Sequence, residues 1–195
     1  MRLPKISPKV KYFLLGILFV FIAIVVGIWI WNPAGKVEKD REWFNQRSVG
    51  ASNIVNSHLV KINQIAVEID RDFNELVNES NKPNSDKKKL NQYATVVRQN
   101  ITKSRTLAEE TCSQFKAFIQ SDERDFKQRG EDIDKLCGIF EHYNKGLDMK
   151  ETAVKALLDG SRLVYDVNVQ MSNEWLTDAT KKLGEFESSP LQPSY

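Results

Sequence analysis

Apolar residues recur at steps of three and four along most of the chain, which is the spacing of one face of an α-helix. The first such stretch covers residues 36–79, with charged residues such as Lys61, Glu68 and Arg71 between the apolar positions. The pattern predicts one long amphipathic helix. Its apolar stripe comprises Ile54, Val55, Leu59, Ile62, Ile65, Ala66, Ile69, Phe73, Leu76 and Val77.

The polar run NESNKPNSD at residues 78–86 predicts the first turn. Pro83 cannot continue a helix, and the hydroxyl of Ser85 is suited to cap the next helix, which we expect to begin near Asp86.

The middle of the chain allows two interpretations. Apolar residues recur there at every seventh position without interruption, which favours one unbroken helix with a coiled-coil seam. The polar run QSDERDFKQRG at 120–130 instead allows a turn near residues 124–125, which would place Cys112 opposite Cys137. A straight helix separates these cysteines by about 37 Å, whereas a hairpin allows a disulfide between them. The residues that carry the seven-residue spacing are Cys112, Ile119, Phe126, Ile133 and Phe140.

Lys145 and Gly146 predict the next helix end, and Asp148 with Glu151 resembles a capping box at the start of the last helix. That helix is expected to use an apolar stripe that includes Val164, Val167, Met171 and Trp175, and it precedes a flexible tail at residues 188–195. The expected fold class is therefore all-α. We predict an antiparallel bundle over residues 36–187 with three long helices, or four if the middle helix folds back.

Residues 12–31 form a run of twenty residues without a charge, long enough to cross a bilayer as a helix. The run follows a basic tail at residues 1–11 and ends in Trp29 and Trp31, which suit a membrane interface better than a signal-peptidase site. We therefore expect a retained signal-anchor and a single-pass membrane protein whose first partner is the lipid bilayer.

Four basic residues precede this run and three follow it closely, which favours a cytoplasmic amino terminus and an extracytoplasmic body, periplasmic or extracellular. Within the run, Gly16, Ala23 and Gly27 share one helical face. Small residues on one face allow another span to approach closely, although glycine is also common in membrane helices without such a role.

The composition narrows the classes of function. Four of the 28 Lys and Arg residues precede residue 12, whereas all 26 Asp and Glu residues follow it, so the body is nearly neutral. A nucleic-acid partner would require a basic face, so none is expected. The triplets that begin at Asn78 and Asn100 match the N-glycosylation acceptor sequence.

No pattern of residues predicts a catalytic, cofactor-binding or metal site. His58 and His142 each lack obvious ligand neighbours in the sequence, and His142 is interpreted as part of a solvated helix face. The two cysteines are expected to be structural. The phenylalanines of the middle region are expected in the core, and they are Phe115, Phe118, Phe126 and Phe140.

These features favour a membrane-anchored scaffold or accessory subunit that acts through protein–protein contacts between helices, or through self-association. The alternative is an extracytoplasmic helical sensor that binds a small ligand and signals through a partner protein.

Overall fold

The computed structural model describes residues 33–188, and all of their regular structure is helical. The helices are α2 (Pro33–Ser80), α3 (Lys87–Gln120), α4 (Glu123–Leu158) and α5 (Arg162–Ser188). The all-α prediction is confirmed. In the described part of the chain no helix is both long and apolar enough to cross a bilayer, and the predicted span at residues 12–31 lies outside it.

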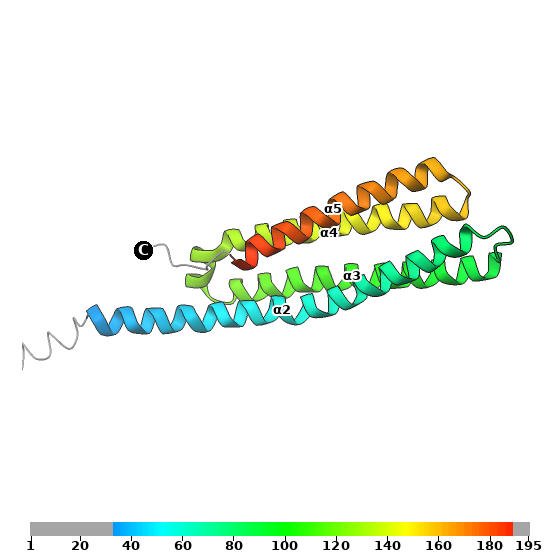
Figure 1. Ribbon diagram of the computed structural model, residues 1–195. Helices are drawn as coiled ribbons and strands as arrows, with labels where there is room; N and C mark the ends of the chain where they lie inside the picture. Colours follow the sequence, from blue (N-terminus) through cyan, green and yellow to red (C-terminus); the bar gives the residue numbers. More distant parts are fainter. Residues whose placement is uncertain (1–32, 189–195) are drawn as a thin grey trace, which may run out of the picture. The chain divides into compact units, whose positions relative to one another are not determined.

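The chain divides into two units, residues 1–46 and residues 47–195. In the first unit the structure describes the start of α2, where Glu38, Lys39 and Arg41 are exposed. In the second unit the rest of α2 and the three following helices form an antiparallel bundle, in which each helix reverses the direction of the one before it (Figure 1).

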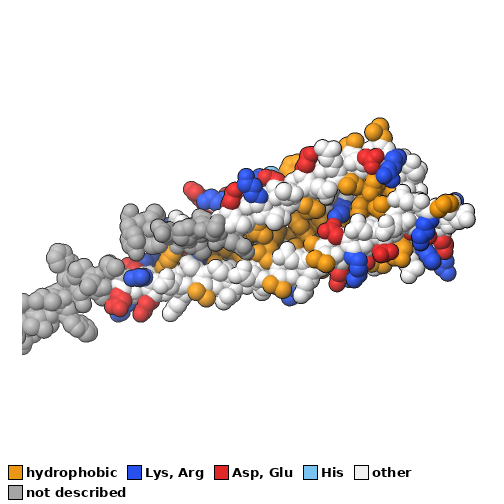
Figure 2. All heavy atoms as spheres, in the orientation of Figure 1, with side chains coloured by type: hydrophobic (Ala, Val, Ile, Leu, Met, Phe, Trp, Pro, Cys, Tyr) orange, Lys and Arg blue, Asp and Glu red, His pale blue; other side chains and the backbone are white. Residues whose placement is uncertain are grey.

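Two groups of buried apolar residues hold this bundle together. One group surrounds Leu76, Ile101 and Val154 and draws on all four helices, because Tyr165 of α5 stacks against Phe73 of α2 at 6.1 Å between ring centroids. The other surrounds Ile62, Phe115 and Leu136, and its buried members come from α2, α3 and α4. Figure 2 shows hydrophobic side chains along the seam where the pair α4–α5 faces the pair α2–α3.

Polar contacts fix the alignment of the helices. The hydroxyls of Ser104 and Tyr143 lie 2.6 Å apart, and Ser104 is fully buried. Lys150 of α4 forms an ion pair with Asp70 of α2. Because a shift of one helix along another would leave these groups without partners, they favour a single register.

The preferred prediction of one unbroken middle helix is wrong. α3 ends at Gln120 and α4 begins at Glu123, and the Asp122 carboxylate accepts hydrogen bonds from the backbone N–H groups of Arg124 and Asp125 at 2.9 and 3.2 Å. This N-cap supplies partners that the first turn of α4 otherwise lacks. The seven-residue spacing misled because Ile119 before the turn and Ile133 after it both face the core of the hairpin.

The predicted helix end at Gly146 is also wrong, since α4 continues to Leu158. The chain turns instead at Gly160, whose φ of 74° lies in the region that favours glycine. Gly146 serves close packing: a Cβ atom there would lie 2.7 Å from Leu176 Cγ of α5. At the first turn the cap is Asp86 rather than Ser85, because the Asp86 carboxylate accepts a hydrogen bond from the N–H of Lys88.

Candidate functional site

A cavity of about 550 Å³ lies along the packed pair α4 and α5. Its walls combine carboxylates, amines and an imidazole with two apolar side chains. The lining residues are Asp132, Asp134, Lys135, Gly138, Ile139, Glu141, His142, Lys182, Glu185 and Phe186. A cavity of this size with a few polar groups is typical of sites for small molecules.

His142 forms the polar centre of this cavity wall. Its Nδ1 atom lies 2.6 Å from Oδ2 of Asp178, and Lys182 Nζ lies 2.8 Å from the same oxygen. Because an ionised carboxylate only accepts hydrogen bonds, a bond between Nδ1 and Asp178 requires a hydrogen on Nδ1. Lys182 Nζ also lies 3.1 Å from Nδ1, so the three groups form one polar cluster. The Lys182 ammonium, and then the His142 imidazole, hold the pKa of Asp178 below its usual range.

Trp175 extends this group of residues along α5. Its ring meets the His142 ring edge to face, with centroids 4.9 Å apart, and Lys145 Nζ lies 5.1 Å from the Trp175 centroid. The spacings between Trp175, Asp178 and Lys182 are three and four, so one face of α5 carries all three residues. The glycine at position 146 lets this face approach α4 closely.

The sequence-based interpretation of His142 as a solvated residue is wrong. Its side chain is 28% exposed and is bonded across two helices to a residue 36 positions away. The other histidine, His58, is buried and its Nδ1 lies 2.9 Å from the carbonyl oxygen of Ile54. In residues 33–188 no group of three His, Cys, Asp or Glu side chains has an arrangement that could hold a metal ion.

A second surface feature is the outward side of the first half of α5. Leu163, Val164, Val167 and Met171 are 78%, 46%, 47% and 39% exposed. The sequence predicted the last three of these as part of the packing stripe, which is wrong, because the buried positions of this helix are Tyr165, Ser172 and Ala179.

The inner side of α5 packs against the core but also carries a buried serine. Ser172 is 1% exposed, and among the described residues its Oγ has no hydrogen-bond partner. Side chains at i and i+4 form ridges that pack into the grooves of neighbouring helices. Leu163, Val167 and Met171 form such a ridge, pointing away from the bundle core.

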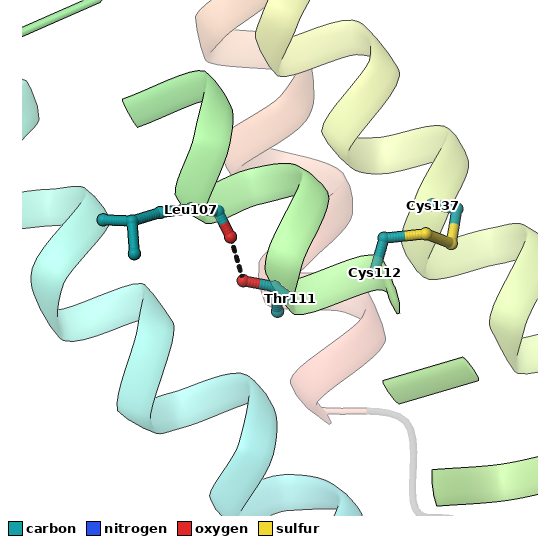
Figure 3. The surroundings of a disulfide bond; sticks show 4 residues. All are labelled: Leu107, Thr111, Cys112 and Cys137. Atoms are coloured by element: carbon teal, nitrogen blue, oxygen red, sulfur yellow. Dashed lines mark hydrogen bonds between the residues drawn. A yellow bond between two sulfur atoms is a disulfide. The ribbon is translucent and has the colours of Figure 1, made fainter. Parts of the chain in front are cut away.

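The remaining predicted residues have different outcomes. Cys112 of α3 and Cys137 of α4 are joined by a disulfide, with Cα atoms 5.3 Å apart, beside Thr111, whose hydroxyl donates to the Leu107 carbonyl (Figure 3). Phe115 and Phe140 are buried, whereas Phe126 is 45% exposed and its assignment to the core is wrong. Gly16, Ala23 and Gly27 lie outside the described residues.

Sequence reasoning missed Asp178, Lys182 and Trp175 as partners of His142. Their spacing on α5 was readable, but their meeting with α4 depends on the close packing at Gly146. No protein-family model, curated protein or solved structure matches the chain.

Proposed function

We propose that this protein is a membrane-tethered helical bundle that binds a helix of another protein on the outward ridge of α5. The observation that carries the proposal is the exposure of Leu163, Val167 and Met171, three apolar side chains at steps of four on the outward side of α5. Burying such a ridge against a partner would remove its apolar surface from water, which favours association.

The surroundings of the ridge indicate the chemistry of the partner. A shallow depression beside it is lined by three carboxylates and one amine, which come from Asp166, Glu174, Asp178 and Lys181. A partner helix with an apolar stripe bordered by Lys or Arg would satisfy both the ridge and this acidic flank.

The tether and the location of the body are further parts of the proposal. The uncharged run at residues 12–31 has the length of a bilayer span, and the disulfide between Cys112 and Cys137 suits an oxidising compartment outside the cytosol. A partner held in the same membrane would meet the bundle at a high effective concentration.

Site-specific photocrosslinking in native membranes tests the binding surface. A photoreactive residue at Val167 or Met171 should yield one protein adduct, with crosslinks that map to one face of a partner helix. The matched control at Thr102, exposed on α3, should not yield it. Val167→Glu should abolish the adduct formed from position 171. Equal capture at position 102, or adducts with no common partner, would contradict the proposal.

Glycosylation provides a separate test of topology. Asn78 is exposed near the end of α2, whereas Asn100 is 5% exposed, with its amide nitrogen 3.4 Å from an Asp72 oxygen. In a glycosylating host, an extracytoplasmic body should gain a glycan at Asn78 that Asn78→Gln removes. The protein should also resist alkaline carbonate extraction. An unmodified chain that washes off the membrane would refute the tether and the orientation.

The cavity at His142 favours a second function, the sensing of a small ligand by an extracytoplasmic bundle. The carboxylates around this cavity suit a ligand with hydrogen-bond donors or positive charge, and the His142 imidazole lies among them. A thermal-shift screen of small amines and amino acids would test it, and a hit should be lost in His142→Ala. Identical shifts in both proteins would exclude this cavity as the site.

A further inference from the structure

The solvent-facing side of α2 has a regular pattern that neither the core nor the ridge of α5 explains. Val49, Asn53, Asn56, Val60, Asn63 and Val67 follow one another at alternating steps of four and three, and all six are exposed. The three valines are 59%, 58% and 70% exposed. We call these six residues the outer seam.

The outer seam lies opposite the core face of the same helix. Val55, Ile62 and Ile69 recur every seven residues and are at most 4% exposed, so the core face and the outer seam repeat with the same period on opposite sides. Solvated helix faces normally carry charges. The outer seam carries none, and the neighbouring charges Lys61 and Glu68 project to one side of it.

Alternating steps of three and four are the spacing of the a and d positions of a coiled coil. In this register Val60 and Val67 occupy a positions, where β-branched residues favour two-stranded assemblies. Asparagine at a and d positions weakens such a pair but specifies its alignment, because the amide is both a donor and an acceptor and can bond to its equivalent in a second helix.

The order of residues selects a parallel pairing with an identical helix. In a parallel two-fold pair each position meets its own copy, so valine meets valine and asparagine meets asparagine at every layer. An antiparallel pair centred on the outer seam would place Asn56 against Val60 twice. A hydrophobic partner helix would leave Asn53, Asn56 and Asn63 unsatisfied.

We propose that α2 pairs in parallel with α2 of a second copy along the outer seam. The inference rests on the proposed membrane tether, because three valine layers interleaved with asparagine would pair only weakly between chains that are free in solution. Two chains anchored in one bilayer share an orientation and a high effective concentration, which converts weak affinity into stable pairing.

Cysteine crosslinking of the full-length chain in its membrane tests this pairing. Val60→Cys should form a dimer under mild oxidation that a reductant reverses, since position 60 meets its own copy in a parallel pair but meets position 56 in an antiparallel pair centred on the outer seam. The matched control is Lys61→Cys, also exposed but rotated about 100° around the helix, and it should give several-fold less dimer. The chain without either substitution sets the background, because Cys112 and Cys137 are already bonded.

Two further experiments test the orientation of the pair and the apolar nature of its contact. Differently tagged Val49→Cys and Val67→Cys chains, expressed together, should not crosslink to each other, and a mixed dimer would overturn the parallel arrangement. Val67→Lys introduced beside Val60→Cys should reduce the crosslink. Its unchanged circular dichroism would show that the bundle remains folded, since position 67 is 70% exposed.

Carbonate extraction of the same membranes measures whether the chain is anchored in the bilayer. If the chain stays in the membrane but its Val60→Cys and Lys61→Cys variants crosslink equally, the pairing is refuted and the tether is supported. If the chain is extracted, the tether fails. Oxidation of the concentrated purified chain then decides the pairing by the same comparison of positions 60 and 61.

Discussion

Gly146 of α4 lies so close to Leu176 of α5 that a Cβ atom on the glycine would be 2.7 Å from Leu176 Cγ and 3.2 Å from the Leu176 backbone nitrogen. These distances are well inside van der Waals contact. The two helices can therefore pack at this spacing only because position 146 has no side chain, and the same approach brings Trp175 and Asp178 to His142.

We expect Gly146→Ala to destabilise the protein by about 1–3 kcal/mol, because an added methyl group forces α4 and α5 apart in a packed region. Chemical denaturation would measure the loss. Gly138→Ala is the matched control on the same helix, since a Cβ there would meet nothing within 4 Å. It should raise stability by up to about 1 kcal/mol through helix propensity. Equal effects of the two substitutions would contradict the close-packing role of Gly146.

The disulfide should contribute to stability by restricting the unfolded chain. Cys112 and Cys137 are 25 residues apart, and closing a loop of this size is worth about 3 kcal/mol in the chain-entropy model. Cys112→Ala combined with Cys137→Ala should therefore lower the denaturation midpoint, and reductant should lower that of the natural chain but not that of the double variant. Intact mass before and after reduction and alkylation would show whether the purified chain carries the bond.

Asp125 should be one of the most sensitive positions in the bundle. Its fully buried carboxylate bonds Arg47 of α2 at 2.7 Å and Arg129 of α4 at 2.6 Å. Removing the carboxylate would deprive both guanidinium groups of this counter-charge. The side chain of Arg129 is only 4% exposed, so water could not replace the lost partner. We expect Asp125→Asn to cost about 3 kcal/mol or more.

The control for this substitution is Glu123→Gln, which breaks an ion pair with Lys127 on the same helix. Both side chains of that pair are more than 70% exposed, so the expected change is below about 0.5 kcal/mol. Urea denaturation of the two variants would show the difference. A loss at Asp125 no larger than that at Glu123 would show that the buried ion-pair network adds nothing to stability.

The stabilising effect of Asp178 should depend on pH. Its pKa is lowered in the folded protein by Lys182 and then by His142, so the unfolded chain takes up the proton first as the solution becomes acidic. Its contribution is therefore fully present above the ordinary carboxyl value of about 4 and disappears as the pH falls through the lower folded value.

Thermal unfolding of the natural chain and Asp178→Asn would test this dependence. The natural chain should have the higher Tm at neutral pH, and the two values should converge in acid. Asp166→Asn is a suitable control, because Asp166 contacts Arg162 at 3.4 Å in an exposed ion pair on the same helix. A Tm difference at Asp178 that does not change with pH would show that the carboxylate charge is not the cause.

The sequence predicted the helical class because the apolar periodicity is strong and helix-breaking residues are few. It also located the turn at residues 81–86, where Pro83 follows the end of α2 and cannot itself continue a helix. These features depend on neighbouring residues alone, which explains why they were accessible without a structure.

The other two turns were misplaced because their local signals are ambiguous. Glycine is used both where φ is positive and where two helices come very close, and the sequence does not distinguish Gly160 from Gly146. The turn at residues 121–122 depends partly on Arg47, which donates hydrogen bonds to the Phe118 carbonyl and the Ser121 hydroxyl. Such help from a distant residue leaves no local pattern.

The candidate sites were harder to predict because they arise from tertiary packing. His142 and Asp178 meet only after α4 and α5 pack together. For α5 the sequence offers two helical faces, one with Val164, Val167 and Met171 and one with Tyr165 and Ala179. Both faces are apolar, since Val169 and Leu176 share the second one, and the structure buries that second face, so only the fold reveals the exposed ridge.

The short connections between the helices also govern how quickly the native state is reached. Residues 81–86, 121–122 and 159–161 each join one helix to the next, and α4 packs against both of its neighbours along the chain. Since the entropic cost of closing such small loops is low, we expect folding within microseconds to milliseconds. Successive hairpins can thus form in chain order, which brings the two thiols together before α5 packs.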